Sequence, residues 1–272
     1  MDDMTRPVIR IQTPAEILQR NWIGYCTIVR KEVRRFMRIW MQTVFPPVIT
    51  TSLYFLIFGT LIGKRIGTMG GYPYLDYIVP GLILMAIITN AYSNVSSSFY
   101  STKFQRHIEE MLVSPLPNWI IVAGYVTGGV ARGLAVALVV TSVALVFANV
   151  QVQHPAFALL VVILTATLFA LAGFINAMLA RNFDDVTIVP TFILTPLTYL
   201  GGVFYSIDLL PDLWRNLSFA NPILYMVNAM RFSVLGVSDI PIATSLILIV
   251  LFIIAFAWIS VQLMNRGIGI KS

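Results

Sequence analysis

Six apolar runs, separated by short polar segments, limit what this sequence can fold into. Each run is close to the roughly 20 residues that an α-helix needs to cross the hydrocarbon core of a bilayer. A helix satisfies its backbone hydrogen bonds internally, so it is the structure that such runs adopt in lipid. We therefore expect an all-α membrane protein with six transmembrane helices, at residues 44–63, 77–100, 120–147, 157–179, 186–203 and 242–264.

The composition also indicates a membrane protein. Of the 272 residues, 58% are hydrophobic and 11% are charged, whereas a soluble domain carries about 25% charged residues. No polar segment is long enough to fold alone, so we expect residues 1–272 to form a single membrane domain. The only cysteine, Cys26, excludes an internal disulfide and a cysteine-rich metal site.

The distribution of basic residues predicts the orientation. The net charge is +6, and eight of the 18 Lys and Arg residues precede residue 40. With a cytoplasmic N-terminus, the inner segments carry thirteen basic residues and the outer segments carry four. Positive residues accumulate on the cytoplasmic side of membrane proteins, so we expect both termini in the cytoplasm and no nucleic-acid partner. The polar first twenty residues do not resemble a cleavable signal peptide.

Residues 15–42 show helical periodicity, with an apolar side that carries aromatic residues and a side rich in Arg and Lys. A basic amphipathic helix of this kind lies flat in the headgroup layer and contacts lipids. We therefore favour an interfacial helix over a solvated helix next to the membrane.

The connection at residues 104–117 predicts a short cytoplasmic helix that ends before Pro115 and Pro117. Such a helix, charged on one side and apolar on the other, suits docking into a groove on a soluble partner. A metal site at His107 and Glu110 is the alternative, but it lacks a third ligand. The residues that we select in this helix are Arg106, His107, Glu109, Glu110, Met111 and Leu112.

Polar side chains inside two of the runs are candidate functional groups. Arg132 lies in the middle of the third run, where a charge is costly in hydrocarbon and must face protein or water. It could contact a substrate or tether two helices. The second run carries Asn90 and Asn94 toward its inner end. Such groups bond across helices more often than they line a cavity.

Residues 204–231 are too polar and proline-rich for a spanning helix, and too aromatic for an ordinary aqueous loop. Backbone that is not helical is tolerated at membrane depth where protein or a watery cavity covers it, and Trp and Tyr favour the headgroup level. We expect short re-entrant pieces that form a lid on the outer side. The lid residues that we select are Leu210, Pro211, Trp214, Asn221, Pro222 and Tyr225.

Catalytic motifs are missing from the sequence. Residues 59–65, GTLIGKR, lack the spacing and the Ser or Thr of a phosphate-binding loop, and the sequence has no HExxH and no GxSxG. We therefore expect no ATP hydrolysis, no catalytic residue, no metal site and no cofactor in this chain.

The string PLTYLGGVFYSIDLLPDLWRNLSFANPILYMVNAMR, residues 196–231, resembles the C-terminal signature of ABC-2 type transporter permeases. The length and layout of the whole chain are also similar, most of all to the YadH-like group of bacterial inner-membrane permeases. The matching positions are Pro196-Leu197, Gly201-Gly202, Leu210-Pro211, Trp214, Asn221-Pro222-Ile223, Tyr225 and Arg231.

The resemblance implies a permease subunit of the bacterial inner membrane that acts as two copies with two copies of a separate ATPase, which holds ATP and Mg. It implies that residues 15–42 form an elbow helix and that residues 104–117 contain the coupling helix that docks into the ATPase. The first and fifth spans would border the substrate path or the interface between protomers. Our candidates for that path are Thr50, Tyr54, Asn90, Asn94, Arg132, Thr191, Thr195 and Tyr199.

The same resemblance implies export of an amphipathic substrate, such as a drug, a lipid or a lipid-linked glycan. The alternative is an ATPase-coupled regulator or structural protein that moves nothing across the membrane. A secondary carrier is less favoured because it usually has internal repeats and titratable groups in its spans.

Overall fold

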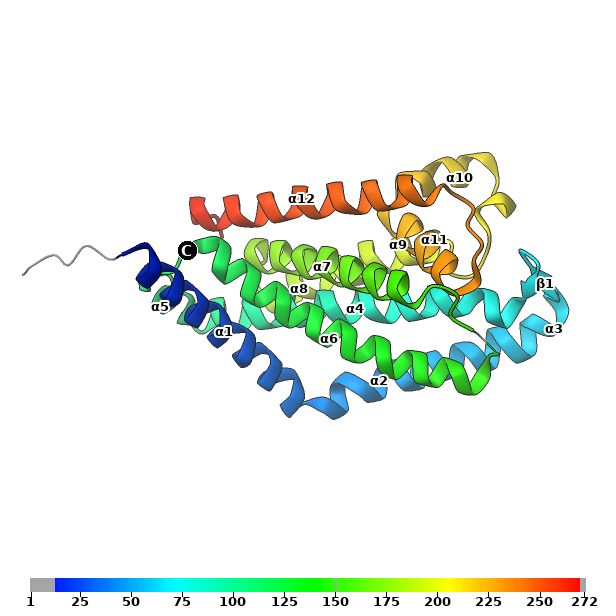
Figure 1. Ribbon diagram of the computed structural model, residues 1–272, viewed down its shortest axis with the longest axis horizontal. Coiled ribbons are helices and arrows are strands. Elements are labelled where there is room, and N and C mark those ends of the chain that lie inside the picture. Colours follow the sequence, from blue (N-terminus) through cyan, green and yellow to red (C-terminus); the bar gives the residue numbers. More distant parts are fainter. Residues whose placement is uncertain (1–12, 150, 270–272) are drawn as a thin grey trace, which may run out of the picture.

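The computed structural model of the chain describes residues 13–149 and 151–269, and these residues are mostly helical (Figure 1). One small antiparallel hairpin, β1 (Thr68–Met69) with β2 (Tyr72–Pro73), is the exception in the described part. In chain order the helices are α1 (Pro14–Arg38), α2 (Trp40–Tyr54), the π-helix η1 (Phe55–Ile62), α3 (Gly63–Ile66), α4 (Tyr74–Phe104), α5 (His107–Val113), α6 (Asn118–Phe147), α7 (Pro155–Leu179), α8 (Phe183–Val189), the π-helix η2 (Pro190–Leu194), α9 (Thr195–Leu200), the 3₁₀ helix η3 (Ile207–Leu209), α10 (Asp212–Phe219), α11 (Pro222–Leu235) and α12 (Ile242–Arg266).

Five of the described helices are long and apolar enough to cross a membrane. A sixth, shorter helical stretch runs through α8, η2 and α9. The expectation of a mostly helical membrane fold is therefore confirmed, with five helices able to span a membrane and a sixth, shorter stretch. The five spans are Trp40–Ile66, Tyr74–Phe104, Asn118–Phe147, Pro155–Leu179 and Ile242–Arg266.

The stretch expected as a continuous fifth span, residues 186–203, is instead divided into α8, η2 and α9. Proline lacks an N–H and its ring clashes with the carbonyl four residues earlier. After Pro190 the chain widens into a π-helical turn, in which the Thr195 N–H bonds to the Pro190 carbonyl five residues before it. The helix then ends at Leu200, and Gly202 reverses the chain with a φ of +72°.

The helix expected over residues 15–42 is also interrupted. α1 begins with a capping box between Thr13 and Glu16, and it ends at Arg38. Ile39 leaves the helical region with φ −104° and ψ 35°, and α2 starts at the next residue. α1 therefore crosses the bundle obliquely and meets α2 at a bend (Figure 1).

Glycines let α1 approach α6 closely. A Cβ built on Gly124 would lie 2.6 Å from the Ile28 side chain, and one on Gly128 would lie 2.4 Å from Glu32 Cβ. This is the close packing that small residues spaced by four allow in membrane helices. The oblique position of α1 therefore follows from the glycine face of α6.

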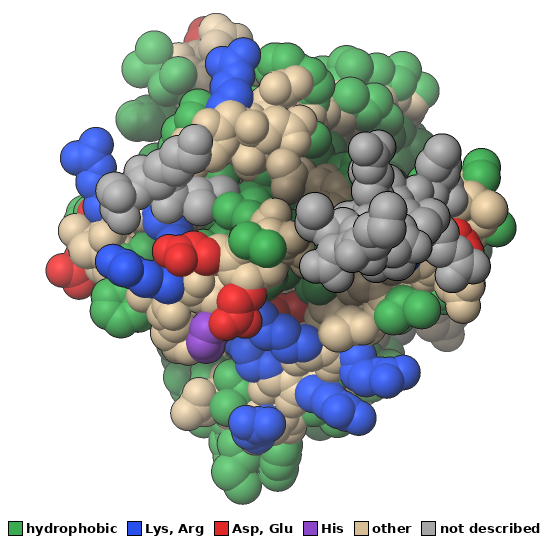
Figure 2. Space-filling model, turned by 90° about the vertical axis from the view of Figure 1, so that its left-hand side faces the viewer, with side chains coloured by type: hydrophobic (Ala, Val, Ile, Leu, Met, Phe, Trp, Pro, Cys, Tyr) green, Lys and Arg blue, Asp and Glu red, His purple; other side chains and the backbone are tan. Residues whose placement is uncertain are grey.

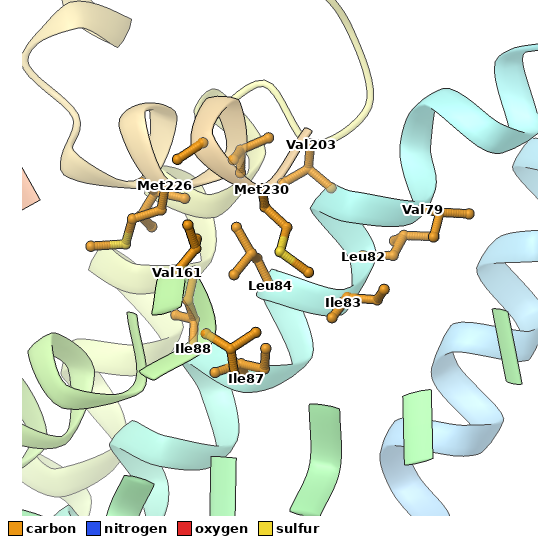
Figure 3. Packing of buried hydrophobic residues seen from close by; sticks show 14 of the residues in the cluster. Val79, Leu82, Ile83, Leu84, Ile87, Ile88, Val161, Val203, Met226 and Met230 are labelled. Carbon is orange, nitrogen blue, oxygen red and sulfur yellow. The ribbon is translucent and has the colours of Figure 1, made fainter. Parts of the chain in front are cut away.

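α4 is the central helix of the fold. In its most apolar window 78% of residues are buried, compared with 11% in α12 at the periphery. Figure 3 shows Leu84 and Ile88 of α4 packed beside Val161 of α7 and Met230 of α11. α4 thus contributes to both hydrophobic clusters of the bundle, and it carries Thr89 and Asn90 of the site described next.

Candidate functional site

A cleft of about 340 Å³ lies between α2, α4 and α6. Its walls combine apolar side chains with threonines, an asparagine and an arginine. The cleft could therefore contact both the polar group and the hydrocarbon chain of a ligand. Its lining residues are Gln42, Pro46, Pro47, Thr50, Thr51, Tyr54, Leu82, Met85, Ala86, Thr89, Asn90 and Arg132.

Arg132 projects from α6 into this cleft and is only 9% exposed. Its Nη2 donates a hydrogen bond of 3.2 Å to Asn90 Oδ1 on α4, and this asparagine orients itself by donating to the Ala86 carbonyl at 3.0 Å. The two predicted residues therefore act together, and the predicted tether between helices is present. The hydrogen bond to Asn90 uses one nitrogen of the guanidinium, Nη2.

A second hollow of about 220 Å³ adjoins the first and lies between α4 and the irregular helix formed by η2 and α9. Met85 and Thr89 line both spaces, so the two hollows adjoin along α4. We call their polar lining residues, Arg132, Asn90 and the threonines, the polar surface. Thr191 and Thr195 face this second hollow.

Tyr54 lines the first cleft and links it to α9, because the hydroxyl oxygens of Tyr54 and Tyr199 lie 3.2 Å apart. The predicted path residues are therefore brought together, with the exception of Asn94.

Asn94 belongs to a separate polar network between α1 and α4. Arg35 Nη2 donates to Asn94 Oδ1 and to the Asn94 carbonyl, both at 2.8 Å. Arg35 also pairs with Glu32 Oε2 at 3.3 Å, and Ser98 donates to Glu32 Oε1 at 2.7 Å. Because Glu32 is completely buried, these donors are what allow its charge inside the protein.

The sequence prediction does not include Glu32 and Arg35, because it treats the many basic residues of this helix as lipid-facing. The spacing of Ile28, Glu32 and Phe36, four residues apart, places Glu32 on an apolar face of the helix. The structure shows that all three residues are buried. An acidic residue on such a face indicates a buried polar partner.

The short helix α5 lies at one end of the bundle and packs against α4 (Figure 1). It starts one residue later than expected because Arg106 adopts a left-handed conformation with φ 61° and serves as its N-cap residue. Ile108 is buried in the bundle, whereas Glu109, Glu110 and Leu112 are exposed. Val113 is 86% exposed, so the helix presents acidic and apolar groups together.

The end of the molecule that carries α5 is strongly charged. Figure 2 shows basic and acidic side chains gathered on this face, with hydrophobic side chains between them. This end of the molecule therefore exposes charges of both signs together with apolar groups.

Tyr125 connects α5 to the other helices at this end. Its hydroxyl lies 3.0 Å from Thr102 Oγ1 on α4, receives a hydrogen bond of 3.2 Å from Lys31 Nζ on α1, and lies 3.7 Å from Met111 Sδ on α5. One buried phenol on α6 thus touches three other helices. A displacement of α5 would therefore change the contacts of Tyr125 with α1 and α4.

Arg231 organises the opposite end. It is 2% exposed, donates to the Gly202 carbonyl at 2.6 Å, pairs with Asp239 at 3.2 Å and stacks over the Tyr77 ring at 4.1 Å. These contacts fix the turn after α9 against α4 and α11.

The predicted lid residues form two groups, one at α10 and one at the start of α11. Asn221 is buried, caps α11 and donates to the Leu197 carbonyl at 2.6 Å, and Tyr225 donates to the Phe219 carbonyl at 2.7 Å. Pro222 is the first residue of α11, and Leu210 and Pro211 lead into α10. Trp214 is 47% exposed on α10, which directs apolar side chains outward.

Comparison with known proteins decides the family. The family model described as ABC-2 type transporter matches residues 24–235 of the chain. The chain belongs to the ABC-2 type transporter family. The matched segment contains α2 to α11 and so includes the cleft, α5 and the Arg231-centred turn.

Two relatives of this ABC-2 protein cover nearly its whole length. It is 55% identical to the inner membrane transport permease YadH of Escherichia coli over 251 residues, which are 92% of this chain and 98% of the relative. It is 25% identical to nodulation protein J of Sinorhizobium fredii over 253 residues, which are 90% and 93% of the two chains. An ABC-2 permease is a multi-pass membrane subunit that generally works with an ABC ATPase partner.

Proposed function

We propose that this chain is the membrane subunit of an ATP-binding cassette exporter in the bacterial inner membrane. Two copies would assemble with two copies of a separate ATPase that holds ATP and Mg. The observation that carries the proposal is the pair of adjoining hollows along α4, lined by Arg132, Asn90 and several threonines inside an apolar bundle. An arginine inside a membrane span is costly and usually faces the bundle interior or a watery cavity.

In this proposal α5 is the coupling helix. Its exposed Glu109, Glu110 and Leu112 are available to a groove on the ATPase, while its buried Ile108 fixes it to the bundle. α1 would be the elbow helix in the headgroup layer, since Trp22 and Trp40 are more than half exposed along it and at its end. Both termini would be cytoplasmic.

The transport step would be alternating access. Closure of the ATPase dimer moves α5, and the Tyr125 contacts pass the movement to Lys31 of α1 and Thr102 of α4. The inner ends of the spans approach each other, and α10 and α11 form the re-entrant lid that opens on the outer side. The permease itself needs no catalytic residue, because its contribution is a different substrate affinity in each state.

The substrate class that fits is an amphipathic molecule: a drug, a lipid or a lipid-linked glycan. The polar surface would hold the polar part. Exposed apolar residues of α2 and η2, including Ile49 and Phe192, would face the second copy or the apolar part of the substrate.

The test is charge reversal on α5. The double substitution Glu109→Lys and Glu110→Lys should abolish copurification of the ATPase, or uncouple ATP hydrolysis from transport, because both carboxylates are exposed and would face the partner. The matched control is Asp212→Lys on α10, an exposed acidic residue at the opposite end of the molecule. Unchanged assembly and transport in the α5 variant would contradict this role.

A membrane regulator that couples to the ATPase without moving a substrate is the second candidate. It would need the charged surface around α5 but not the polar surface in the bundle. Substitutions that fill the cleft, such as Thr50→Trp, would then leave all its activities unchanged, whereas an exporter would lose flux and keep the ATPase bound.

A further inference from the structure

Arg132 has more hydrogen-bonding capacity than the protein around it uses. A guanidinium carries five N–H donors, and the acceptor that the structure gives it is Asn90 Oδ1. Its Nε is buried and donates to no acceptor in the part of the chain that the structure describes. No acidic side chain among these residues forms an ion pair with it. A buried charge without a counter-ion is costly.

Arg231 is the informative comparison within the same chain. It is similarly buried, and its Nε also lacks an acceptor among the described residues, but a carboxylate, a backbone carbonyl and an aromatic ring contact its guanidinium. It therefore has the partners of a structural arginine. Arg132 has no carboxylate partner among the described residues, and it is one of the residues that line the cleft.

The charge of the cleft is positive. Among the residues that line it, Arg132 is the charged one, and none is Asp or Glu. Arg35 of the neighbouring polar network is already balanced by Glu32, at 3.3 Å. Arg132 thus remains the uncompensated charge, and a ligand that enters the cleft meets it at the wall.

The position and shape of the cleft restrict the ligand further. At 1.5 Å per residue, Arg132 lies about 20 Å along α6 from Asn118, which is near the middle of a bilayer. The hydroxyl-bearing residues Thr50 and Thr89 line the same space, together with apolar groups such as Leu82. A ligand that matches these walls has one compact anionic group and an apolar body.

We propose that Arg132 binds the anionic group, a phosphate or a carboxylate, of an amphipathic substrate held in the cleft between α2, α4 and α6. This inference rests on the proposed transport function and narrows its substrate class to anionic amphiphiles. The guanidinium would form charge-assisted hydrogen bonds with the anion. The apolar body would lie against the proline and leucine side chains of the cleft.

The experiment uses the full chain in phosphatidylcholine nanodiscs, without nucleotide or ATPase. Three probes are compared: dodecyl phosphate, dodecyl maltoside with the same chain but no charged group, and inorganic phosphate with no chain. Saturable binding is measured for the wild type, Arg132→Gln, Arg132→Lys and the control Arg215→Gln, whose arginine lies on α10 outside the cleft. Size exclusion and thermal unfolding check that each variant is folded.

The proposal predicts that the wild type binds dodecyl phosphate at least about tenfold more tightly than dodecyl maltoside, because a hydrogen-bonded charge contributes that much. Arg132→Gln should lose this preference, while Arg132→Lys retains part of it and Arg215→Gln retains it fully. Inorganic phosphate should bind weakly, since it lacks the apolar body.

Equal affinity of the wild type for the two dodecyl probes overturns the proposal without reference to any variant. Unchanged binding by a folded Arg132→Gln protein overturns the role of this residue. Inorganic phosphate that binds as tightly as dodecyl phosphate would identify a site for free anions and reject the amphiphile. If binding fails while the chain and its ATPase still transport an amphiphile without an anionic group, the anionic substrate is rejected and the proposed transport function stands.

Discussion

The hydroxyl oxygens of Tyr54 and Tyr199 lie 3.2 Å apart, so the first membrane span is hydrogen bonded to a helix 145 residues later in the chain. Phe204 packs against both rings, with centroid distances of 5.5 Å to Tyr54 and 5.8 Å to Tyr199. The three rings form one aromatic cluster between α2, α9 and the segment that follows α9. In the proposed transport cycle this is a contact that separates when the lid opens.

This pair predicts coupled effects on stability. Tyr54→Phe and Tyr199→Phe should each lower the free energy of unfolding by about 0.5–1.5 kcal/mol, because each removes one hydroxyl of the pair. The double variant should lose little more than either single variant. Thermal unfolding of the purified proteins provides the comparison, and strictly additive losses would show that the two hydroxyls do not interact.

The buried pair of Arg231 and Asp239 should stabilise the fold more than an exposed pair does. Asp239→Asn leaves the Arg231 guanidinium buried without its carboxylate, and we expect a loss of about 1–3 kcal/mol. The control is Asp208→Asn, which removes the partner of Arg215 where both side chains are exposed. That change should cost about 0–1 kcal/mol. Equal unfolding temperatures for the two variants would contradict the role of Arg231.

Close packing of α4 and α7 predicts a strong effect at Gly173. A Cβ there would lie 2.4 Å from the Tyr92 carbonyl oxygen, which is backbone and cannot rotate away. Gly173→Ala should therefore cost about 1–3 kcal/mol of stability. Gly133→Ala on α6 is the matched control, because its nearest contact would be the Ala166 side chain at 3.1 Å. A Gly173→Ala protein as stable as this control would contradict the helix arrangement.

The helices themselves could be predicted from the sequence, because an apolar run of about 20 residues has few other structures available in lipid. α6, for example, covers Asn118–Phe147, and its glycines indicate a close helix neighbour. What the sequence could not provide is the partner of each polar group. Asn94 bonds to Arg35, 59 residues earlier, and a linear pattern contains no distances between helices.

The irregular stretches were equally hard to foresee. Pro190 and Pro196 weaken a helix, but a proline can end it, kink it or be accommodated in a π-helical turn. In the structure, Pro190 is accommodated in the π-helical turn η2. The break at Ile39 has no proline or glycine at all, so no local signal marked it.

Orientation can be tested with single cysteines. In a Cys26→Ser background, Glu110→Cys on α5 should react with a membrane-impermeant maleimide only after the cells are permeabilised, whereas Asn216→Cys on α10 should react in intact cells. The reason is the excess of basic residues in the segments on the α5 side. Labelling of position 110 in intact cells would reverse the proposed topology.

The central claim is that this chain forms a path through the membrane but takes its energy from a separate ATPase. The most direct measurement is transport of a fluorescent anionic amphiphile by proteoliposomes that contain the chain alone, or the chain with the ATPase that copurifies with it. We predict transport only when both subunits, ATP and Mg are present, and its loss in the Glu109→Lys and Glu110→Lys double variant. Transport by the chain alone at the same rate, without nucleotide, would contradict the account.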